Sequence, residues 1–189
     1  GDPVTEADLA VNQLLKDQLT AHQPDYGWLS EECADDHSRL SKTRLWVVDP
    51  IDGTRAFIKG LAEYVVSIAL VEHGSTIAAC LYDPNRQALY GAIKGEGAWL
   101  NDQPICVKDR HVLEGAKLVA ADDVLRSKLW PRPWPHMETD NPNSIALRLA
   151  LIAEGARHAA FTLRPKSDWD LAAATLILEE AGGYVRDHE

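Results

Sequence analysis

Apolar residues recur at helical spacing near the start of the chain. Between Thr5 and His22 they are Leu9, Val11, Leu14, Leu15 and Leu19. This spacing is typical of one face of an α-helix. Thr5 is followed three residues later by Asp8, which resembles a capping box with Asp in place of the usual Glu or Gln. The pattern therefore predicts an N-terminal helix that begins beside Asp8.

Short apolar runs bounded by turn residues predict strands through the rest of the first half. The predicted strands cover residues 26–30, 45–48, 64–71, 76–82, 88–93 and 105–107. His73-Gly74-Ser75 separates two of these runs and predicts a hairpin. The polar segment 33–43 predicts an exposed loop.

Helical spacing returns in the second half. Ser144 to Glu154 predicts a strong helix with Gly155 at its C-cap, and Trp169 to Ala181 predicts another. Residues 159–163 are expected to form a strand between them. Antiparallel hairpins followed by alternating elements predict an α+β protein built from stacked layers. We expect an N-terminal α+β subdomain over 1–112 and a C-terminal α/β subdomain over 113–189, packed as one compact unit.

Composition narrows the class of protein. The 189 residues are 46% hydrophobic and carry a net charge of −10, which argues against nucleic acid as the main partner. No apolar run is long enough for a membrane span, and no signal peptide is visible. The three cysteines are widely spaced and are expected to be reduced thiols of a cytoplasmic protein. Both termini are expected to belong to a longer native chain.

The run Asp49-Pro50-Ile51-Asp52-Gly53-Thr54 carries the strongest chemical signal. Two carboxylates follow a buried strand at a turn that proline and glycine favour, so both can point to one side. Clustered hard oxygen ligands suit Mg²⁺. A short helix over 54–59 would add backbone N–H groups that attract phosphate. Taken alone, the two acids could equally be a strand-end cap and an ordinary turn residue.

Three further acidic positions change the balance toward a metal site. Glu31-Glu32 ends another predicted strand, Asp170 begins a predicted helix, and Asp8 lies in the first turn of the N-terminal helix. Each has an ordinary alternative, namely a solvated loop, a helix N-cap and a first-turn acid.

Four motifs in the same order resemble the inositol monophosphatase superfamily of magnesium-dependent, lithium-sensitive phosphatases. They are residues 2–8 (DPVTEAD), 29–32 (LSEE), 46–54 (WVVDPIDGT) and 169–173 (WDLAA). Residues 52–59 (DGTRAFIK) are most similar to the CysQ-like 3'(2'),5'-bisphosphate nucleotidase branch. The resemblance spans nearly the whole chain and implies an αβαβα sandwich with two or three Mg²⁺ ions.

The resemblance also implies roles for individual residues. The expected metal ligands are Glu31, Asp49, the Ile51 carbonyl, Asp52 and Asp170. The expected catalytic residues are Asp8, Glu31 and Thr54, with Thr54 and Asp8 positioning and deprotonating the attacking water. The expected substrate contacts are Asp52, Gly53, Thr54, Arg164, Lys166 and Asp170. The implied reaction is phosphomonoester hydrolysis by a metal-activated water, without a covalent enzyme intermediate.

Substrate choice depends on the segment before Asp170. Where inositol phosphatases carry an acidic residue that contacts sugar hydroxyls, this chain has Leu163, followed by Arg164 and Lys166. Two cations suit a second anionic group on the substrate, although they could equally be surface charges. We therefore expect adenosine 3',5'-bisphosphate to be the substrate, with inositol 1-phosphate and fructose 1,6-bisphosphate as alternatives. Trp130 and Trp134 are core or loop anchors, or else a base-stacking surface.

Two competing functions remain open. Haloacid-dehalogenase-like phosphatases use an Asp-x-Asp-Gly-Thr run, but here Pro50 and Ile51 separate the acids and the register is wrong. A non-catalytic regulator that binds RNA polymerase or RNA is the alternative of another class. Such a binding module would have no chemical need for every acidic ligand. The resemblance also implies a homodimer and a small phosphorylated substrate.

Overall fold

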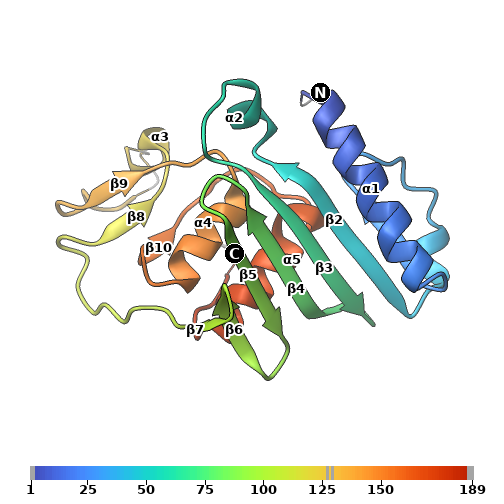
Figure 1. The fold of residues 1–189 in the computed structure, drawn as a ribbon. Coiled ribbons are helices and arrows are strands. Elements are labelled where there is room, and N and C mark those ends of the chain that lie inside the picture. Colours follow the sequence, from blue (N-terminus) through green and yellow to red (C-terminus); the bar gives the residue numbers. More distant parts are fainter. Residues whose placement is uncertain (1–2, 127, 129, 187–189) are drawn as a thin grey trace.

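The computed structural model describes residues 3–126, 128 and 130–186. Seven strands form one sheet in which spatial order follows chain order (Figure 1). They are β1 (Gly27–Ser30), β2 (Arg44–Asp52), β3 (Val65–Glu72), β4 (Ser75–Asp83), β5 (Ala88–Ile93), β6 (Gly97–Leu100) and β7 (Gln103–Ile105). β1 runs parallel to β2, whereas every other neighbouring pair is antiparallel.

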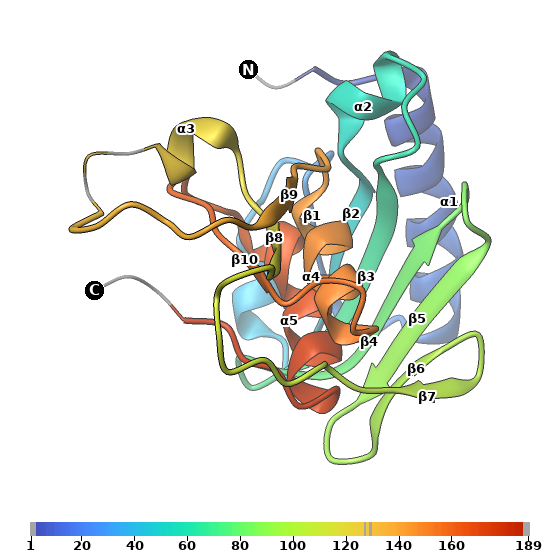
Figure 2. The same cartoon turned by 90° about the vertical axis from the view of Figure 1, so that its left-hand side faces the viewer.

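A smaller parallel sheet has the order β10-β8-β9. Its strands are β8 (Lys117–Val119), β9 (Glu138–Asp140) and β10 (Ala159–Ala160). α4 (Ile145–Ala153) and α5 (Asp168–Glu180) fill the space between the two sheets (Figure 2). α1 (Glu6–His22) covers the opposite face of the large sheet, and α3 (Asp122–Leu125) lies beyond the small one. The order of layers is therefore helix, sheet, helix, sheet, helix, as expected.

The middle helices supply much of the core. α4 buries seven of its nine residues, because one face packs on α5 and the other lies toward the small sheet. α5 packs across β2 to β6 and buries Ala173 and Ala174 almost completely. Small side chains allow a helix to approach a sheet closely, and that approach places the first turn of α5 beside the end of β2.

The sequence predicts most helix boundaries, because capping residues determine them. Thr5 caps α1 and forms the expected capping box with Asp8. Ser144 caps α4 through a hydrogen bond from the Leu147 N–H, and Gly155 follows the helix with a φ of 74°. α5 begins and ends one residue earlier than expected, and its N-cap is Ser167, so Asp170 is not the N-cap that was its ordinary alternative.

Several strands were not predicted. β6, β8 and β9 span three or four residues each, too few for a reliable apolar period. The last strand of the large sheet covers Gln103–Ile105 and not 105–107. The strand-like segment 182–186 is irregular in the structure. In the described part of the chain, no helix has the length and apolar character needed to cross a membrane.

Candidate active site

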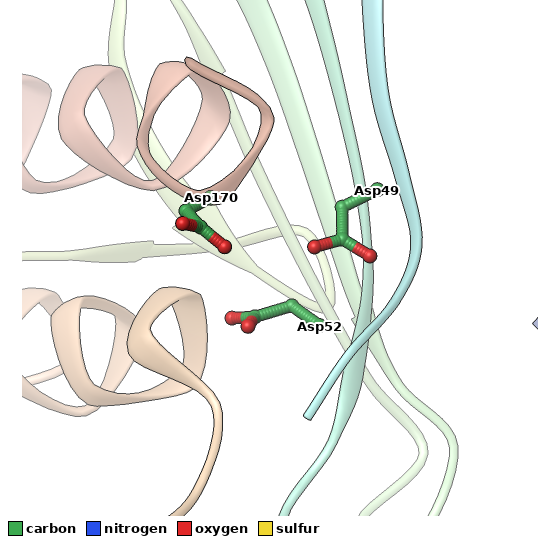
Figure 3. Close-up of side chains that lie close together, drawn as sticks. All are labelled: Asp49, Asp52 and Asp170. Atoms are coloured by element: carbon green, nitrogen blue, oxygen red, sulfur yellow. The ribbon is translucent and has the colours of Figure 1, made fainter. Parts of the chain in front are cut away.

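Three aspartates meet where β2 ends and α5 begins. Asp49 and Asp52 come from β2, and Asp170 comes from the first turn of α5 (Figure 3). One carboxylate oxygen from each residue lies within 4.8 Å of the others. β2 does not end at Asp49 as the sequence suggested but continues to Asp52, with an irregularity in its pairing to β3 between the two acids. That irregularity replaces strict alternation and lets both side chains face α5.

Asp49 is buried without enough polar partners of its own. Its Oδ1 accepts a hydrogen bond from the Ile51 N–H at 3.0 Å, while its Oδ2 is buried with no hydrogen-bond partner. Burial raises the pKa of Asp49 well above its ordinary value, and Asp52, Glu31 and Asp170 raise it further. A buried carboxylate oxygen aimed at two other carboxylates is expensive unless a cation is present.

Asp52 is fixed by the N-terminus of α4. Its Oδ2 accepts hydrogen bonds from the Ser144 hydroxyl and the Ala146 N–H, both at 2.6 Å. Burial raises the pKa of Asp52 to about 6, although these two hydrogen bonds oppose the rise. One oxygen is thereby occupied by α4, and the other faces the aspartate cluster.

Asp8 and Thr54 meet across 46 residues of chain. The Thr54 Oγ1 lies 3.1 Å from the Asp8 Oδ1 and 3.0 Å from the Ile51 carbonyl oxygen. The other Asp8 oxygen accepts the Thr5 N–H at 2.8 Å, which holds the carboxylate in place. A hydroxyl that donates to a carboxylate keeps its own lone pairs available, so Thr54 can accept a hydrogen bond from a water.

Gly53 is required by its surroundings. It caps the short helix α2 (Thr54–Ile58) with a φ of 107°, which side-chain-bearing residues rarely adopt. A Cβ built there would lie 2.6 Å from the Glu63 carbonyl oxygen. Glycine therefore lets the chain turn sharply between Asp52 and Thr54.

Glu31 and Asp170 reach the site from different elements, the end of β1 and the start of α5. Glu31 follows β1, where its N–H donates to the Val48 carbonyl at 3.3 Å, and it lines the same pocket without belonging to the group of three aspartates. The Asp170 Oδ2 accepts the Ser167 N–H at 2.8 Å and so stabilises the start of α5. Its capping role and its place in the cluster are therefore compatible.

A pocket of about 340 Å³ opens over these acids. Nearly all of the expected site residues line it: Glu31, Asp49, Ile51, Asp52, Gly53, Thr54, Arg164, Lys166 and Asp170. Asp8 is not among the lining residues and reaches the site through Thr54. Arg164 and Lys166 are exposed at the rim, where Lys166 lowers the pKa of Asp52 by its charge.

Sequence reasoning missed Arg148 and Ser144. Arg148 lines the pocket, and its Nε donates to the Pro142 carbonyl at 2.7 Å. Its burial lowers the pKa of the guanidinium, while Asp52 is the first of the acids that oppose this. The signal was present, because Arg148 is the one charged residue in an otherwise apolar helix. Ser144 was expected only as a helix start, and its contact with Asp52 depends on tertiary packing.

An aromatic group forms another wall of the pocket region. Phe161 lines the pocket, and the Trp130 and Trp134 rings pack around it at centroid distances of 6.1 and 5.5 Å. The two tryptophans contact each other edge to face at 4.9 Å. Val124, from α3, lines the same pocket. The pocket therefore combines carboxylates, cations and an apolar surface.

The residues present fit a divalent metal. The donors are carboxylate and carbonyl oxygens, which Mg²⁺ prefers, and the Asp49 Oδ2 lacks any other partner. Three converging carboxylates in a buried corner would repel one another without a cation.

Comparison with known proteins identifies relatives across the whole chain. The model of the inositol monophosphatase family matches residues 1–189. The Nus factor SuhB of Pasteurella multocida is 34% identical over 194 residues, covering 98% of this chain and 72% of the relative. The inositol-1-monophosphatase of Rhizobium meliloti is 30% identical over 208 residues, covering 100% and 73%. The 3'(2'),5'-bisphosphate nucleotidase CysQ of Escherichia coli is 35% identical over 191 residues, covering 98% and 76%.

Solved structures of inositol monophosphatase type also superpose on this chain. The extragenic suppressor protein suhB of Bartonella henselae superposes with a TM-score of 0.83 at 28% identity, covering 97% of this chain and 73% of that one. SaIMPase-II with 2'AMP bound gives a TM-score of 0.79 at 28% identity, covering 95% and 71%.

Proposed function

Because the chain belongs to the inositol monophosphatase family and is a magnesium-dependent phosphoric monoester hydrolase, we propose that it is a 3'(2'),5'-bisphosphate nucleotidase. Its reaction would be the hydrolysis of adenosine 3',5'-bisphosphate to AMP and phosphate. The observation that carries this proposal is the cationic side of the pocket, where Arg148, Arg164 and Lys166 lie beside the aspartate cluster. A substrate with a second phosphate uses that side, whereas an inositol monophosphate does not.

The acidic residues divide into two groups in this proposal. Glu31, Asp49 and the Ile51 carbonyl would hold one ion, and Asp49, Asp52 and Asp170 would hold another. Bound Mg²⁺ supplies a Lewis acid for the phosphoryl oxygens and lowers the pKa of a coordinated water. Asp49 belongs to both groups, which agrees with its place in the aspartate cluster and with its unpartnered Oδ2.

Asp8 and Thr54 would handle the proton of the attacking water. The Thr54 hydroxyl donates its hydrogen bond to the Asp8 Oδ1, so its oxygen can accept a hydrogen bond from the attacking water. This contact would orient the lone pair of the water toward phosphorus. Asp8, buried on α1 and held by Thr5, would be the final acceptor of the proton. The backbone N–H groups of Gly53 and Thr54 would contact the phosphate at the start of α2.

Arg148, Arg164 and Lys166 would bind the second phosphate. Arg148 is half-buried and oriented by Pro142, so it loses little conformational freedom when it binds. Phe161 would then contact the base, since its ring lies on the apolar wall of the pocket. Two relatives also support a nucleotide as the substrate. CysQ of Escherichia coli is named a bisphosphate nucleotidase, and SaIMPase-II has a solved structure with 2'AMP bound.

A substrate panel tests the proposal. Phosphate release is measured with adenosine 3',5'-bisphosphate, inositol 1-phosphate and fructose 1,6-bisphosphate at equal Mg²⁺. We expect the highest kcat/KM for the nucleotide. A preference for inositol 1-phosphate would establish the second candidate, which the relative from Rhizobium meliloti favours by its name. Activity on no phosphomonoester would favour a regulatory role, since SuhB of Pasteurella multocida is named a Nus factor.

Asp49→Asn tests the metal assignment. The substitution keeps the shape of the side chain but removes its charge, so turnover should fall to background while the protein stays folded. Folding is checked by circular dichroism. Turnover close to that of the unaltered chain would contradict the role of Asp49.

Arg148→Lys tests the second-phosphate site. Lysine keeps the charge but not the planar fork, so we expect KM for adenosine 3',5'-bisphosphate to rise about tenfold, with KM for inositol 1-phosphate nearly unchanged. The matched control is Arg132→Lys, on an exposed arginine outside the pocket. Equal changes for both substrates would argue against a dedicated phosphate contact.

A further inference from the structure

The most deeply buried side chains of α1 are polar, whereas its apolar residues Val11, Leu15 and Leu19 are half-buried. Its two buried residues are Asp8 and Asn12, which are 1% and 6% exposed. Two of its leucines are turned outward, Leu9 at 50% and Leu14 at 60% exposure. A helix normally buries its apolar residues, so burial of an acid and an amide instead requires specific partners. Asp8 and Asn12 are four positions apart and therefore lie on one face, a single turn from each other.

Asn12 contacts both ends of the turn that carries Glu31. Its Oδ1 accepts the hydroxyl of Ser30 at 2.8 Å in a buried hydrogen bond. Its Nδ2 donates to the Sγ of Cys33 at 3.3 Å. The Cys33 N–H donates to the Ser30 carbonyl at 3.3 Å, which closes the turn over Glu31 and Glu32. One side chain therefore holds the residues immediately before and after this pair of acids.

The same helix holds the other half of the catalytic machinery. Asp8 contacts Thr54 at 3.1 Å, one turn of α1 before Asn12 contacts Ser30. α1 is thus a rigid connection between the Asp8–Thr54 pair and the Glu31 turn. We propose that Asn12 is a positioning residue that holds Glu31 at the proper distance from Asp8 and Asp49 for metal binding. This inference rests on the proposed function, because it needs Glu31 to be a ligand.

Hydrogen bonds that orient a metal ligand have an effect on metal affinity of known size. Loss of such a partner typically weakens metal affinity by about 10- to 100-fold. Glu31 follows an edge strand of the large sheet, since β1 spans four residues and pairs with β2 on one side. Asn12 therefore supplies an attachment that β1 alone lacks.

The test measures metal binding by the intact, substrate-free chain. Isothermal titration calorimetry with MgCl₂ compares the unaltered protein with Asn12→Ala, Ser30→Ala and the double variant. We expect each single variant to weaken Mg²⁺ binding about tenfold, and the double variant to be no weaker than either. In steady-state assays the Mg²⁺ concentration at half-maximal rate should rise while KM for the substrate stays constant.

Gln13→Ala is the matched control, because Gln13 is the exposed neighbour of Asn12 and bonds only within α1, to Asp17. Mg²⁺ affinity within twofold of the unaltered chain in Asn12→Ala and Ser30→Ala would overturn the inference. If Asn12→Ala does not fold, Ser30→Ala decides, since it removes a single hydroxyl. If Asn12→Ala and Ser30→Ala bind Mg²⁺ normally while Asp49→Asn does not bind it, only this inference is overturned. Absence of binding in the unaltered chain overturns the proposed function as well.

Discussion

At the scale of single residues, two buried aspartates lower the stability of the metal-free folded state. Asp49 and Asp52 are 1% and 6% exposed, and both pKa values are raised, first by burial and then by neighbouring carboxylates. A folded state that raises an acid's pKa holds protons that the unfolded state releases. The resulting destabilisation is absent below the ordinary pKa and fully present above the raised one. Bound Mg²⁺ would remove this destabilisation by balancing the charge.

Metal-free protein should therefore lose stability as the pH rises from about 4 to about 7. For Asp52 the pKa moves from 3.8 to about 6, and a difference of this size corresponds to about 3 kcal/mol of unfolding free energy. Urea unfolding in EDTA at pH 4 and pH 7 measures most of this change. Asp52→Asn keeps an acceptor for Ser144 and Ala146 but does not titrate, so its unfolding free energy should depend less on pH. An unaltered pH dependence in that variant would contradict the argument.

At the scale of elements, α4 supports the site from its N-terminus. The Ser144 Oγ accepts the Leu147 N–H at 2.9 Å and donates to Asp52 at 2.6 Å. One hydroxyl therefore both starts the helix and fixes a proposed metal ligand. Since Arg148 lies one turn later on α4, the same helix also presents a cation to the pocket.

Ser144→Ala should show both roles. Loss of an N-cap together with a buried hydrogen bond to a carboxylate is expected to lower the unfolding free energy by about 2 kcal/mol. Mg²⁺ binding should weaken as well, because Asp52 loses one of two contacts. Ser41→Ala, in the exposed turn of 3₁₀-helix over Ser38–Ser41, is the control and should change neither quantity. A loss of stability with unchanged Mg²⁺ affinity would limit Ser144 to capping.

Elements with strong local signals could be predicted from the sequence. α1 and α4 follow from capping residues and apolar spacing, and β5 spans Ala88–Ile93 as expected. The short strands β8 and β9 could not be predicted, because their pairing depends on residues distant in the chain. The division at residue 112 stays a prediction.

The residues of the candidate site could be predicted where they lie within a sequence motif. The run from Asp49 to Thr54 pointed to the corner of the fold where three aspartates converge, and resemblance added Glu31 and Asp170. Asn12 and Ser144 could not be found this way, since each is an ordinary helix residue in sequence. Their roles follow from packing of α1 and α4 against β1 and β2.

At the scale of the whole molecule, Mg²⁺ would join distant parts of the chain. Asp49 and Asp52 belong to β2 in the large sheet, whereas Asp170 belongs to α5 in the layer between the sheets (Figures 1 and 3). Binding to the folded state alone stabilises it by mass action, by about 2.7 kcal/mol at 100 times the dissociation constant.

Hydrogen exchange should show where that stabilisation acts. Addition of Mg²⁺ is expected to slow amide exchange most in the first turn of α5 and in the last residues of β2. The β5–β6 hairpin, remote from the aspartates in the chain, is the internal control. Equal protection of all elements would indicate global stabilisation without a specific bridge between β2 and α5.

The chain order of the large sheet also bears on how the molecule folds. Because every strand from β1 to β7 neighbours the next one in sequence, the pairings of the sheet are local along the chain, and we expect the sheet to assemble early. Asp49 and Asp52 would then already lie in one strand before α5 has been synthesised. The arrival of Asp170 adds a third negative charge to a corner that already holds two. We therefore expect repulsion to slow the docking of α5 and bound Mg²⁺ to relieve that repulsion, so refolding should be faster with Mg²⁺ than in EDTA.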